Sequence, residues 1–486
     1  GFIDLFWPGT LIVEQKSAGR SLEEARLQAL DYCAALKPAE HPRHLLASDF
    51  RSFELHDLAE RETVRFALAD LPAHVEHFGF MLGIQRRTFR DQDPVNIEAA
   101  ELVGLLHDEI RASGYDGHRL EQFLVRIVFC LFADDTGIFQ PKDILWDYLE
   151  TRTAPDGSDT GPLLAQLFDV LNTPEGARSP NLDTDLAQFP HVNGALFAEY
   201  FPPPVFNTGM RAALLNACRF DWTPISPAIF GSLFQSVMDH DERRNLGAHY
   251  TTEKNILKVI QPLFLDDLWA EFERIRTSRG SRRRTHLQRF HDKLAGLRFF
   301  DPACGCGNFL IIAYREVRLL ELDVIKEIRE YDRDPHTGAF TGQLDAATLS
   351  RVNVDQFYGI ELEEFPVRIA ETALWMMDHI MNNRLSLAFG KTYARIPLRQ
   401  SPHIHFGNAL EMGWNDVIAA ADVDYVFGNP PFVGHQYRSS SQQQDMHRIW
   451  GRSGQVNRLD YVTCWFRKAV EYAAQTRDVD VAFVST

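Results

Sequence analysis

The sequence lacks any apolar run long enough to span a membrane, and it is poor in cysteine. A spanning helix needs about 20 consecutive apolar residues, and no segment of the chain approaches that length. The six cysteines are scattered, with no CxxC pair and no histidine at zinc-finger spacing. The first residues read as a strand, without the basic segment of a secretory signal. These absences argue against a membrane protein and predict a protein of the bacterial cytoplasm without a structural metal.

Basic residues are also in the minority. The chain carries 50 lysine and arginine residues against 67 aspartate and glutamate residues, which gives a formal net charge of −17. This balance argues weakly against nucleic-acid binding, but phosphate binding depends on local patches rather than on totals. One basic patch is present, formed by Arg274, Arg276, Arg279, Arg282, Arg283, Arg284 and Arg289. It is either a solvated loop around Gly280 or a phosphate-binding surface, and the sequence does not decide between the two.

The length of 486 residues predicts about three domains, at roughly 150 residues each. In residues 1–60 the apolar pattern predicts strands at 2–7, 11–16 and 45–50 and a helix at 22–35. We expect this segment to be part of an α/β domain that begins further upstream. Residues 61–225 have apolar positions three and four apart, most regularly at 102–110 and 120–132, and are predicted to form a helical connector.

Residues 226–486 alternate between predicted strands and helices. Strands are expected at 297–300, 356–360, 425–427 and 481–484, and helices at 255–269, 309–320, 367–378 and 462–474. Strands separated by crossover helices form a parallel sheet with helices on both faces. The predicted fold class is therefore α/β, with a doubly wound, Rossmann-like domain after the helical connector. Because the chain ends just past the last strand, we expect this domain to be incomplete at its C-terminus.

A glycine turn follows the first of these strands, in the sequence DPACGCGNF at residues 301–309. Such a turn lies at the carboxyl edge of a parallel sheet, where small ligands bind. Gly305 and Gly307 let backbone N–H groups approach a ligand, and the helix start after them favours a carboxylate or phosphate. A dinucleotide-binding turn would read GxGxxG with an acidic residue about 20 positions later, and this turn does not fit. Glu361 ends the next strand, where it could bind both hydroxyls of a ribose; the alternative is a surface acid.

A second polar turn follows the strand at 425–427. It consists of Asn429, Pro430, Pro431 and Phe432. The amide oxygen of Asn429 and the carbonyl of Pro430 could both accept hydrogen bonds from one exocyclic amine, which would aim the nitrogen lone pair at a methylsulfonium carbon for in-line attack. Phe432 would stack on a base flipped out of a duplex. Such a turn can be purely structural, but the glycine turn on the same sheet edge favours the functional interpretation.

Three charged residues near the N-terminus form the pattern D-x9-ExK, namely Asp4, Glu14 and Lys16. The Pro8-Gly9 turn should bring Asp4 beside Glu14, and strand alternation puts Glu14 and Lys16 on one face. Asp4 and Glu14 could hold Mg²⁺, while Lys16 could orient or deprotonate the attacking water of phosphodiester hydrolysis. The alternative is a hairpin with exposed charges.

The two turns resemble motifs I and IV of the amino-methyltransferases that use S-adenosylmethionine, and residues 247–252 (GAHYTT) resemble their motif X. Motif X before motif I is the gamma arrangement, whose members mostly methylate adenine at N6. The resemblance implies S-adenosylmethionine as the cofactor, bound by Tyr250, Thr251, Asp301, Pro302, Ala303, Gly305, Gly307, Asn308, Phe309, Glu361, Asn408 and Ala409. Asn408 would contact the adenine of the cofactor, where many relatives have aspartate. We expect His249 and Cys304 to pack rather than to react.

The predicted helix at 22–35 contains Gln28 and Tyr32, which resemble the QxxxY element of some PD-(D/E)xK nucleases. Together with residues 131–137 (LFADDTG), residues 192–197 (VNGALF) and the methyltransferase motifs, this element resembles the MmeI-like type IIL restriction-modification enzymes over nearly the whole chain. The resemblance implies a single chain that methylates adenine in double-stranded DNA and cleaves unmodified DNA with Mg²⁺, with self-association for cleavage left open. It also implies a target-recognition domain that we expect to lie beyond this sequence.

Three other functions remain open at this point. The first is an adenine methyltransferase of a multi-subunit phage-defence system whose nuclease is inactive, and the intact Asp4, Glu14 and Lys16 argue against it. The second is a protein glutamine methyltransferase, in which the fused nuclease would have no use. The third is a noncatalytic DNA-binding scaffold, which would not bind S-adenosylmethionine.

Overall fold

The computed structural model describes residues 3–33, 36, 42–58, 62–82, 92–192, 196–229, 253–278, 282–331, 350–389, 402–451, 458–476 and 479–485. The chain forms two units. The first comprises residues 1–87 and 386–392, and the second comprises residues 88–385 and 393–486. Each unit has its own five-stranded sheet and its own apolar core.

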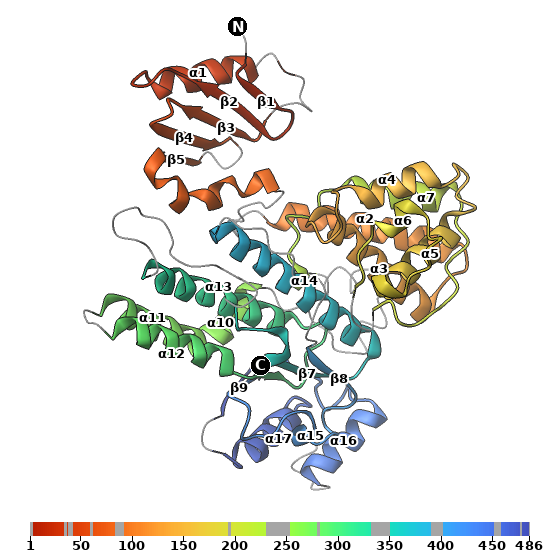
Figure 1. The fold of residues 1–486 in the computed structure, drawn as a ribbon. Helices are drawn as coiled ribbons and strands as arrows, with labels where there is room; N and C mark the ends of the chain where they lie inside the picture. The colour runs from red at the N-terminus through yellow and green to blue at the C-terminus, as the bar shows by residue number, and fades with distance from the viewer. Residues whose placement is uncertain are drawn as a thin grey trace. The chain divides into compact units, whose positions relative to one another are not determined.

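The first unit is built on a sheet whose strands follow the chain order (Figure 1). These strands are β1 (Leu5–Trp7), β2 (Leu11–Gln15), β3 (His44–Ser48), β4 (Ser52–Asp57) and β5 (Glu62–Ala67). Helix α1 (Leu22–Cys33) connects β2 to β3, which run parallel, and the other pairs are antiparallel. Ala25 and Ala29 of α1 pack with Ile12 and Leu45 of the sheet. Two 3-10 helices, η2 (Leu68–Ala73) and η3 (Val75–Leu82), follow.

This sheet extends beyond the boundary predicted at residue 60. β5 pairs with β4 along its whole length, so residues 62–67 form a strand and not the start of the helical connector. The apolar pattern did not predict these strands because a charged residue is buried in β4. Glu54 is 2% exposed, and the guanidinium of the exposed Arg65, on the opposite strand, pairs with its carboxylate at 2.7 Å. The α/β unit therefore continues at least to Ala67.

The connector is helical, as predicted. Its helices are α2 (Gln92–Ala112), α3 (Gly117–Asp135), α4 (Ile144–Arg152), α5 (Thr160–Asn172), α6 (Thr184–Ala187) and α7 (Thr208–Arg219), with short 3-10 helices at Glu175–Ala177 and Pro227–Ile229. Asp134 and Asp135 at the end of α3 are structural: Asp134 accepts a hydrogen bond from the backbone N–H of Leu145, and Asp135 accepts one from that of Trp222. Burial raises the pKa of Asp134 to about 6 and that of Asp135 to about 7.

The second sheet is parallel throughout, with strand order β10-β9-β6-β7-β8. Its strands are β6 (Phe299–Asp301), β7 (Phe357–Glu361), β8 (His403–Phe406), β9 (Tyr425–Gly428) and β10 (Asp480–Phe483). The helices around it are α10 (Glu253–Ile260), α11 (Asp266–Thr277), α12 (Arg283–Gly296), α13 (Asn308–Glu330), α14 (Glu364–Phe389), α15 (Trp414–Val417), α16 (Ser440–Trp450) and α17 (Thr463–Ala473). This arrangement confirms the predicted doubly wound fold.

Several details of this domain differ from the prediction. β8, α12, α15 and α16 were not expected, and most arginines of the second half of the basic patch lie on α12 rather than in a loop. The helix predicted at 255–269 is interrupted by a π-helical turn at Gln261–Leu265, which contains Pro262. Proline has no N–H for the α-helical hydrogen-bond ladder, and this accounts for the interruption. Arg279 and Gly280 of the patch lie outside the described residues.

Strand alternation distributes the aromatic side chains of the second sheet to its two faces. Phe299 stacks on Phe357 with ring centroids 4.7 Å apart, in the core that includes α13 and α14. Phe300, the next residue, contacts Trp414 and Tyr472 in the core of α15, α16 and α17. Figure 1 shows α13 and α14 on one side of this sheet and α15–α17 on the other. Both faces are therefore buried, as the apolar strands predict.

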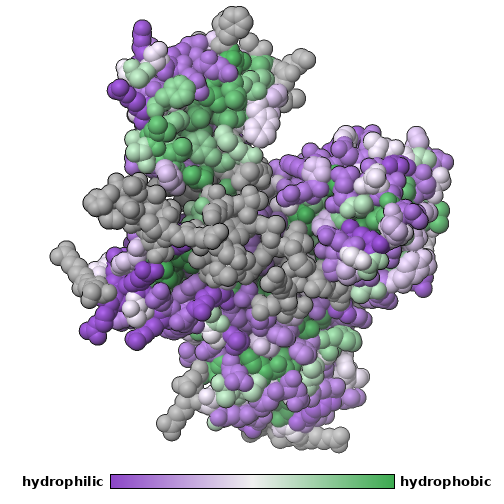
Figure 2. Space-filling model, in the orientation of Figure 1, coloured by the Kyte–Doolittle hydropathy of each residue, from purple (hydrophilic) through white to green (hydrophobic). Residues whose placement is uncertain are grey.

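The surface of the helical connector is mainly hydrophilic on the face shown in Figure 2. Among the described residues, no helix combines the length and the apolar character required to cross a bilayer.

Candidate functional site

The two polar turns of the second unit follow neighbouring strands. β6 pairs with β9 in parallel register, Phe299 with Tyr425 and Phe300 with Val426. Parallel neighbours end at the same edge of a sheet, so the turn after Asp301 lies beside the turn after Gly428. The winding of the chain also reverses between β6 and β9, and such a switch point is where ligands bind in open α/β sheets.

A direct contact between Asp301 and Gly428 joins the two strand ends. A Cβ on Gly428 would lie 2.3 Å from Oδ1 of Asp301, so the backbone approach requires glycine. The same Oδ1 accepts a hydrogen bond from the N–H of Ala303 at 2.9 Å, and burial raises the pKa of Asp301 to about 8. Asp301 therefore shapes the glycine turn and fixes it against the strand that carries Asn429.

The glycine turn borders open space on one side and packs tightly on the other. Gly305 and Gly307 have φ values of +54° and +81°, which favour glycine. A Cβ on Gly307 would lie 2.9 Å from that of Ala370 on α14, whereas a Cβ on Gly305 would meet no described atom within 4 Å. Asn308, the first residue of α13, has a buried Oδ1 with no hydrogen-bond partner among the described residues. The turn thus combines room for a ligand with an unused acceptor.

Glu361 lies at the end of β7, next to the glycine turn. Its Oε2 accepts a hydrogen bond from the N–H of Gly305 at 2.9 Å, and its Oε1 accepts one from the N–H of Glu363 at 3.1 Å. Burial raises the pKa of this carboxyl, against the effect of these N–H groups. Each carboxylate oxygen can accept a second hydrogen bond. Glu361 is therefore not an isolated surface acid and retains the capacity to bind ribose hydroxyls.

The Asn-Pro-Pro-Phe turn is anchored by the segment that precedes α17. Val433, directly after Phe432, donates its N–H to Oδ1 of Asp460 at 3.1 Å, and its carbonyl accepts from the N–H of Tyr461 at 3.2 Å. Pro430 is buried, whereas Asn429, Pro431 and Phe432 are half-buried. Phe432 therefore keeps exposed surface on which a base could stack.

Asn408 and Ala409 follow β8 at the same sheet edge. Asn408 accepts a hydrogen bond from the N–H of Leu410 at 2.9 Å through Oδ1, and its Nδ2 donates to both carboxylate oxygens of Asp445, at 3.2 and 3.3 Å. The carbonyl of Ala409 accepts from Nζ of Lys468 at 2.6 Å. β8 lies next to β7, so both residues lie on the side of the sheet edge that carries Glu361.

Residues of α17 complete the site and were not predicted from the sequence. Trp465 donates its Nε1–H to the carbonyl of Pro302 at 3.0 Å. Lys468 binds two backbone carbonyls of the segment after β8, and burial lowers its pKa to about 8. A signal was present: Tyr461, Trp465, Lys468 and Tyr472 recur at intervals of four, three and four residues, which marks one face of a helix.

Of the remaining predicted residues, Cys304 packs as expected. It is buried, its Sγ would lie only 2.8 Å from a Cβ on Gly359, and burial raises its thiol pKa well above the usual value. Phe309 packs near Phe427 of β9, with ring centroids 6.1 Å apart. Tyr250, Thr251 and His249 lie outside the described residues, and their assignment stays a prediction.

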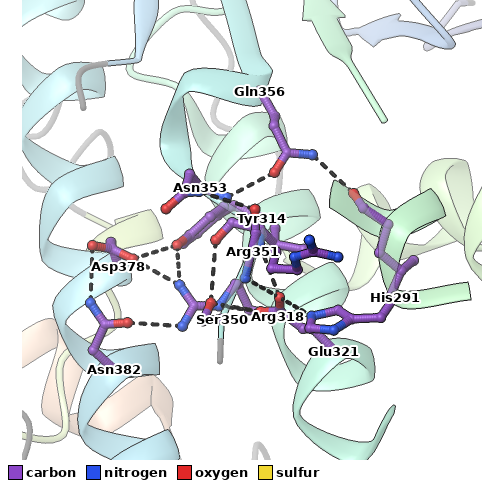
Figure 3. Close-up of polar contacts among 12 residues, drawn as sticks. His291, Tyr314, Arg318, Glu321, Ser350, Arg351, Asn353, Gln356, Asp378 and Asn382 are labelled. Carbon is purple, nitrogen blue, oxygen red and sulfur yellow. Dashed lines mark hydrogen bonds and ion pairs between the residues drawn. The ribbon is translucent and has the colours of Figure 1, made fainter. Parts of the chain in front are cut away.

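A buried polar network holds the helices beside the sheet in place (Figure 3). Glu321 of α13 accepts hydrogen bonds from the ring of His291 and the hydroxyl of Ser350, both at 2.8 Å, and pairs with Arg318 at 3.1 Å. Arg318 also pairs with Asp378 of α14 at 2.8 Å. Burial alone would raise the pKa of Glu321, but these partners lower it below its usual value. The network joins α12, α13 and α14 to the segment that leads into β7, and so fixes the strand that carries Glu361.

In the first unit, one series of hydrogen bonds joins Glu14 and Lys16 to Gln28 and Tyr32 of α1. Glu14 is 3% exposed, and its Oε1 accepts from Nζ of Lys16 at 2.7 Å. Lys16 also donates to Oε1 of Gln28 at 2.5 Å, and Gln28 donates to the hydroxyl of Tyr32 at 2.8 Å. The two residues of the QxxxY element therefore support the lysine, and the burial of Glu14 is unlike that of an ordinary charged hairpin.

Asp4 lies directly before β1, opposite Glu14, because Leu5 pairs with Val13 in the antiparallel register. Its Oδ2 accepts a hydrogen bond from the N–H of Gln15 at 2.7 Å. Oε2 of Glu14 is buried with no hydrogen-bond partner in the described part of the chain, as a metal ligand would be before it binds. No group of three or more metal-binding side chains occurs among the described residues. The two carboxylates fit Mg²⁺, which commonly binds one or two carboxylates and keeps several waters.

The second sheet edge fits S-adenosylmethionine on similar grounds. The open space at Gly305 can admit the ligand, and the free acceptor of Asn308 lies beside it. Glu361 can bind ribose hydroxyls one strand away, and Asn408 and Ala409 follow the strand beyond. The residues present therefore suit a nucleoside with a polar tail.

Comparison with known proteins identifies first the class and then the family. The profile of the MmeI DNA-methyltransferase domain matches residues 276–486, and this match includes both turns of the switch point. The second sheet is thus the core of a DNA-methyltransferase domain. The MmeI N-terminal domain matches residues 1–113, and the MmeI helicase spacer domain matches residues 118–197. The chain belongs to the MmeI family of type IIL restriction-modification enzymes.

Individual relatives agree with this assignment. The structure of the type IIL restriction-modification enzyme MmeI in complex with DNA is 52% identical, with a TM-score of 0.73 over 80% of this chain and 50% of that chain. DNA methyltransferase A of Bacillus subtilis is 34% identical over 466 residues, 94% of this chain and 50% of the relative. A putative type II restriction enzyme and methyltransferase of Methanocaldococcus jannaschii is 24% identical over 335 residues, 60% of this chain and 27% of the relative. The chain spans half or less of the length of these relatives.

Proposed function

We propose that this protein methylates adenine at N6 in double-stranded DNA, using S-adenosylmethionine, and that its first unit cleaves DNA with Mg²⁺. The observation that carries the proposal is the parallel pairing of β6 with β9, which puts the glycine turn and the Asn-Pro-Pro-Phe turn at one switch point. The family supports DNA as the substrate, since the MmeI structure contains DNA. Restriction-modification in the cytoplasm, directed against phage DNA, is the corresponding biological role.

Different residues of the switch point bind the cofactor and position the target amine. When bound, S-adenosylmethionine supplies an electrophilic methyl group on sulfur. Glu361 and the N–H groups of the glycine turn hold the cofactor, while the amide oxygen of Asn429 and the carbonyl of Pro430 each accept a hydrogen bond from the adenine amine. This hydrogen bonding orients the weakly nucleophilic nitrogen for in-line attack, so positioning supplies much of the rate. Phe432 stacks on the flipped base and replaces its stacking in the duplex.

In the first unit, the hydrogen-bonded series from Glu14 to Tyr32 supports phosphodiester hydrolysis. Asp4 and Glu14 are the ligands for Mg²⁺. Lys16 is held by Glu14 and Gln28, and its ammonium orients the attacking water and offsets negative charge on the phosphate. This ordered arrangement favours an active nuclease over an inactive remnant.

Methyl transfer from tritiated S-adenosylmethionine tests the proposal. The whole protein is incubated with unmodified DNA or with cell protein, and the labelled DNA is digested to nucleosides. We expect label in N6-methyl-2′-deoxyadenosine and none with Asn429→Ala, which removes an acceptor of the amine. Label in protein would instead support a glutamine methyltransferase, and no binding of the cofactor in calorimetry would leave only a DNA-binding scaffold.

A further inference from the structure

Asp445 of α16 lies where the two halves of the second-unit site meet. Its side chain is 4% exposed and accepts hydrogen bonds from three residues. These are Asn408 at 3.2 and 3.3 Å, Arg448 at 2.8 Å and the hydroxyl of Tyr461 at 2.6 Å. Asn408 belongs to the cofactor side of the site, whereas Tyr461 is bonded to Val433, directly after Phe432. The carboxylate of Asp445 therefore contacts one residue beside the proposed cofactor site and one residue that anchors the turn proposed to bind the target base.

The chemistry of this contact fixes the orientation of the Asn408 carboxamide. A carboxylate only accepts hydrogen bonds, so Asp445 selects the NH₂ group of Asn408 and turns the carboxamide oxygen the other way. That oxygen accepts from the N–H of Leu410 at 2.9 Å and has a second lone pair available. If the amide were reversed, its NH₂ group would face the amine of an adenine, and two donors would oppose each other.

We propose that Asp445 is a positioning residue that makes the cofactor pocket selective for adenine over a base with an oxygen in place of the amine. The inference rests on the proposed function, in which Asn408 contacts the adenine of the cofactor. It also accounts for asparagine at position 408, where many amino-methyltransferases have aspartate. An aspartate there would place two carboxylates about 3.2 Å apart in a buried site, where like charges repel strongly.

The test compares two nucleoside ligands that differ at one position, S-adenosylhomocysteine and S-inosylhomocysteine, by calorimetry on the whole protein. The wild type should prefer the adenosyl ligand by at least tenfold, because the inosyl oxygen cannot donate to Asn408. In Asp445→Asn the amide at 408 loses the partner that can only accept, while the N–H of Leu410 still favours the native orientation, so we expect this preference to fall by about threefold. If the role of Asp445 were purely structural, D445N would bind both ligands more weakly by the same factor, and the ratio of the two affinities would not change.

Exchange of the two side chains provides the second arm. Asn408→Asp alone should lose most of its affinity for S-adenosylhomocysteine because of repulsion from Asp445. N408D/D445N should recover this affinity, and the preference over S-inosylhomocysteine, to within about threefold of the wild type. Glu411→Gln is the matched control, since Glu411 is an exposed carboxylate that pairs with the same Arg448; it should leave both affinities unchanged. Melting temperatures establish that each variant is folded, and the exchanged variant keeps the test open if D445N does not fold.

Two results would overturn the role of Asp445: an unchanged adenosyl preference in D445N, or an exchanged variant that binds no better than N408D. A wild-type protein that binds neither ligand would instead refute the proposed methyltransferase function. The two failures are therefore distinguishable.

Discussion

Two glycines of one turn have different physical reasons to be glycine. Both adopt positive φ, but Gly307 also packs against Ala370, while Gly305 faces space that we assign to the cofactor. The same substitution at the two positions therefore separates packing from ligand binding, because the backbone strain is common to both.

We predict that Gly307→Ala lowers the free energy of unfolding by about 2–4 kcal/mol, from strain plus overpacking. Gly305→Ala should lower the free energy of unfolding by only about 1 kcal/mol, from strain alone. The same variant should lose most of its affinity for S-adenosylmethionine. Urea denaturation gives the first quantity and calorimetry the second. A Gly305→Ala variant that binds the cofactor normally would show that the space beside this residue is not the cofactor site.

At the N-terminal site, Glu14→Gln should reduce cleavage of unmodified plasmid at least about a hundredfold, because a metal ligand matters no less than the outer-shell groups whose loss has effects of that size. Methyl transfer should be unchanged. The exposed Glu24→Gln on α1 is the control and should cleave normally. If Glu14→Gln cleaves as fast as Glu24→Gln, the buried carboxylate is not part of a nuclease.

At the scale of elements, the buried network around Glu321 ties three helices to the entry of β7. Removing one partner of a buried ion pair leaves the other uncompensated, which is costly. Glu321→Gln should therefore lower the free energy of unfolding by about 3 kcal/mol at pH 7. Because the pKa of Glu321 is lowered in the folded state, this contribution is present above the unfolded pKa and should be lost as the pH falls through the folded value.

The control for this network is Asp292→Asn, which removes a carboxylate from the exposed pair with Arg351. Exposed pairs contribute little, so urea denaturation should show almost no change. Equal effects of the two substitutions would mean that burial of Glu321 is not what gives the network its strength.

Elements with strong local signals could be predicted from the sequence, and those stabilised by distant partners could not. β6, β7, β9 and the first half of α13, predicted at residues 309–320, follow from apolar runs and from the glycine turn. β4 and β5 were missed because Glu54, which is buried and pairs with the exposed Arg65, reads as a surface charge, and β8 was missed because its sequence, HIHF, is short and half polar. The contact of Asn408 with Asp445 crosses 37 residues, so no local pattern reveals it.

At the scale of the whole molecule, one chain carries two units, to which we assign two different chemistries. Asp4, Glu14 and Lys16 lie on or directly beside strands of the first sheet, and the two turns proposed for methyl transfer follow strands of the second. Each unit has its own core, so substitutions at one site should leave the other folded. This separation suits an enzyme in which methylation and cleavage compete for the same DNA.

The central claim is that the two turns at the β6–β9 switch point methylate adenine in DNA. Single-molecule sequencing of DNA from cells that express the whole protein tests it most directly. We predict N6-methyladenine at one fixed sequence context, absent from cells that express the Asn429→Ala variant. DNA with no modified adenine, or with methyl groups that persist in the variant, would contradict the claim.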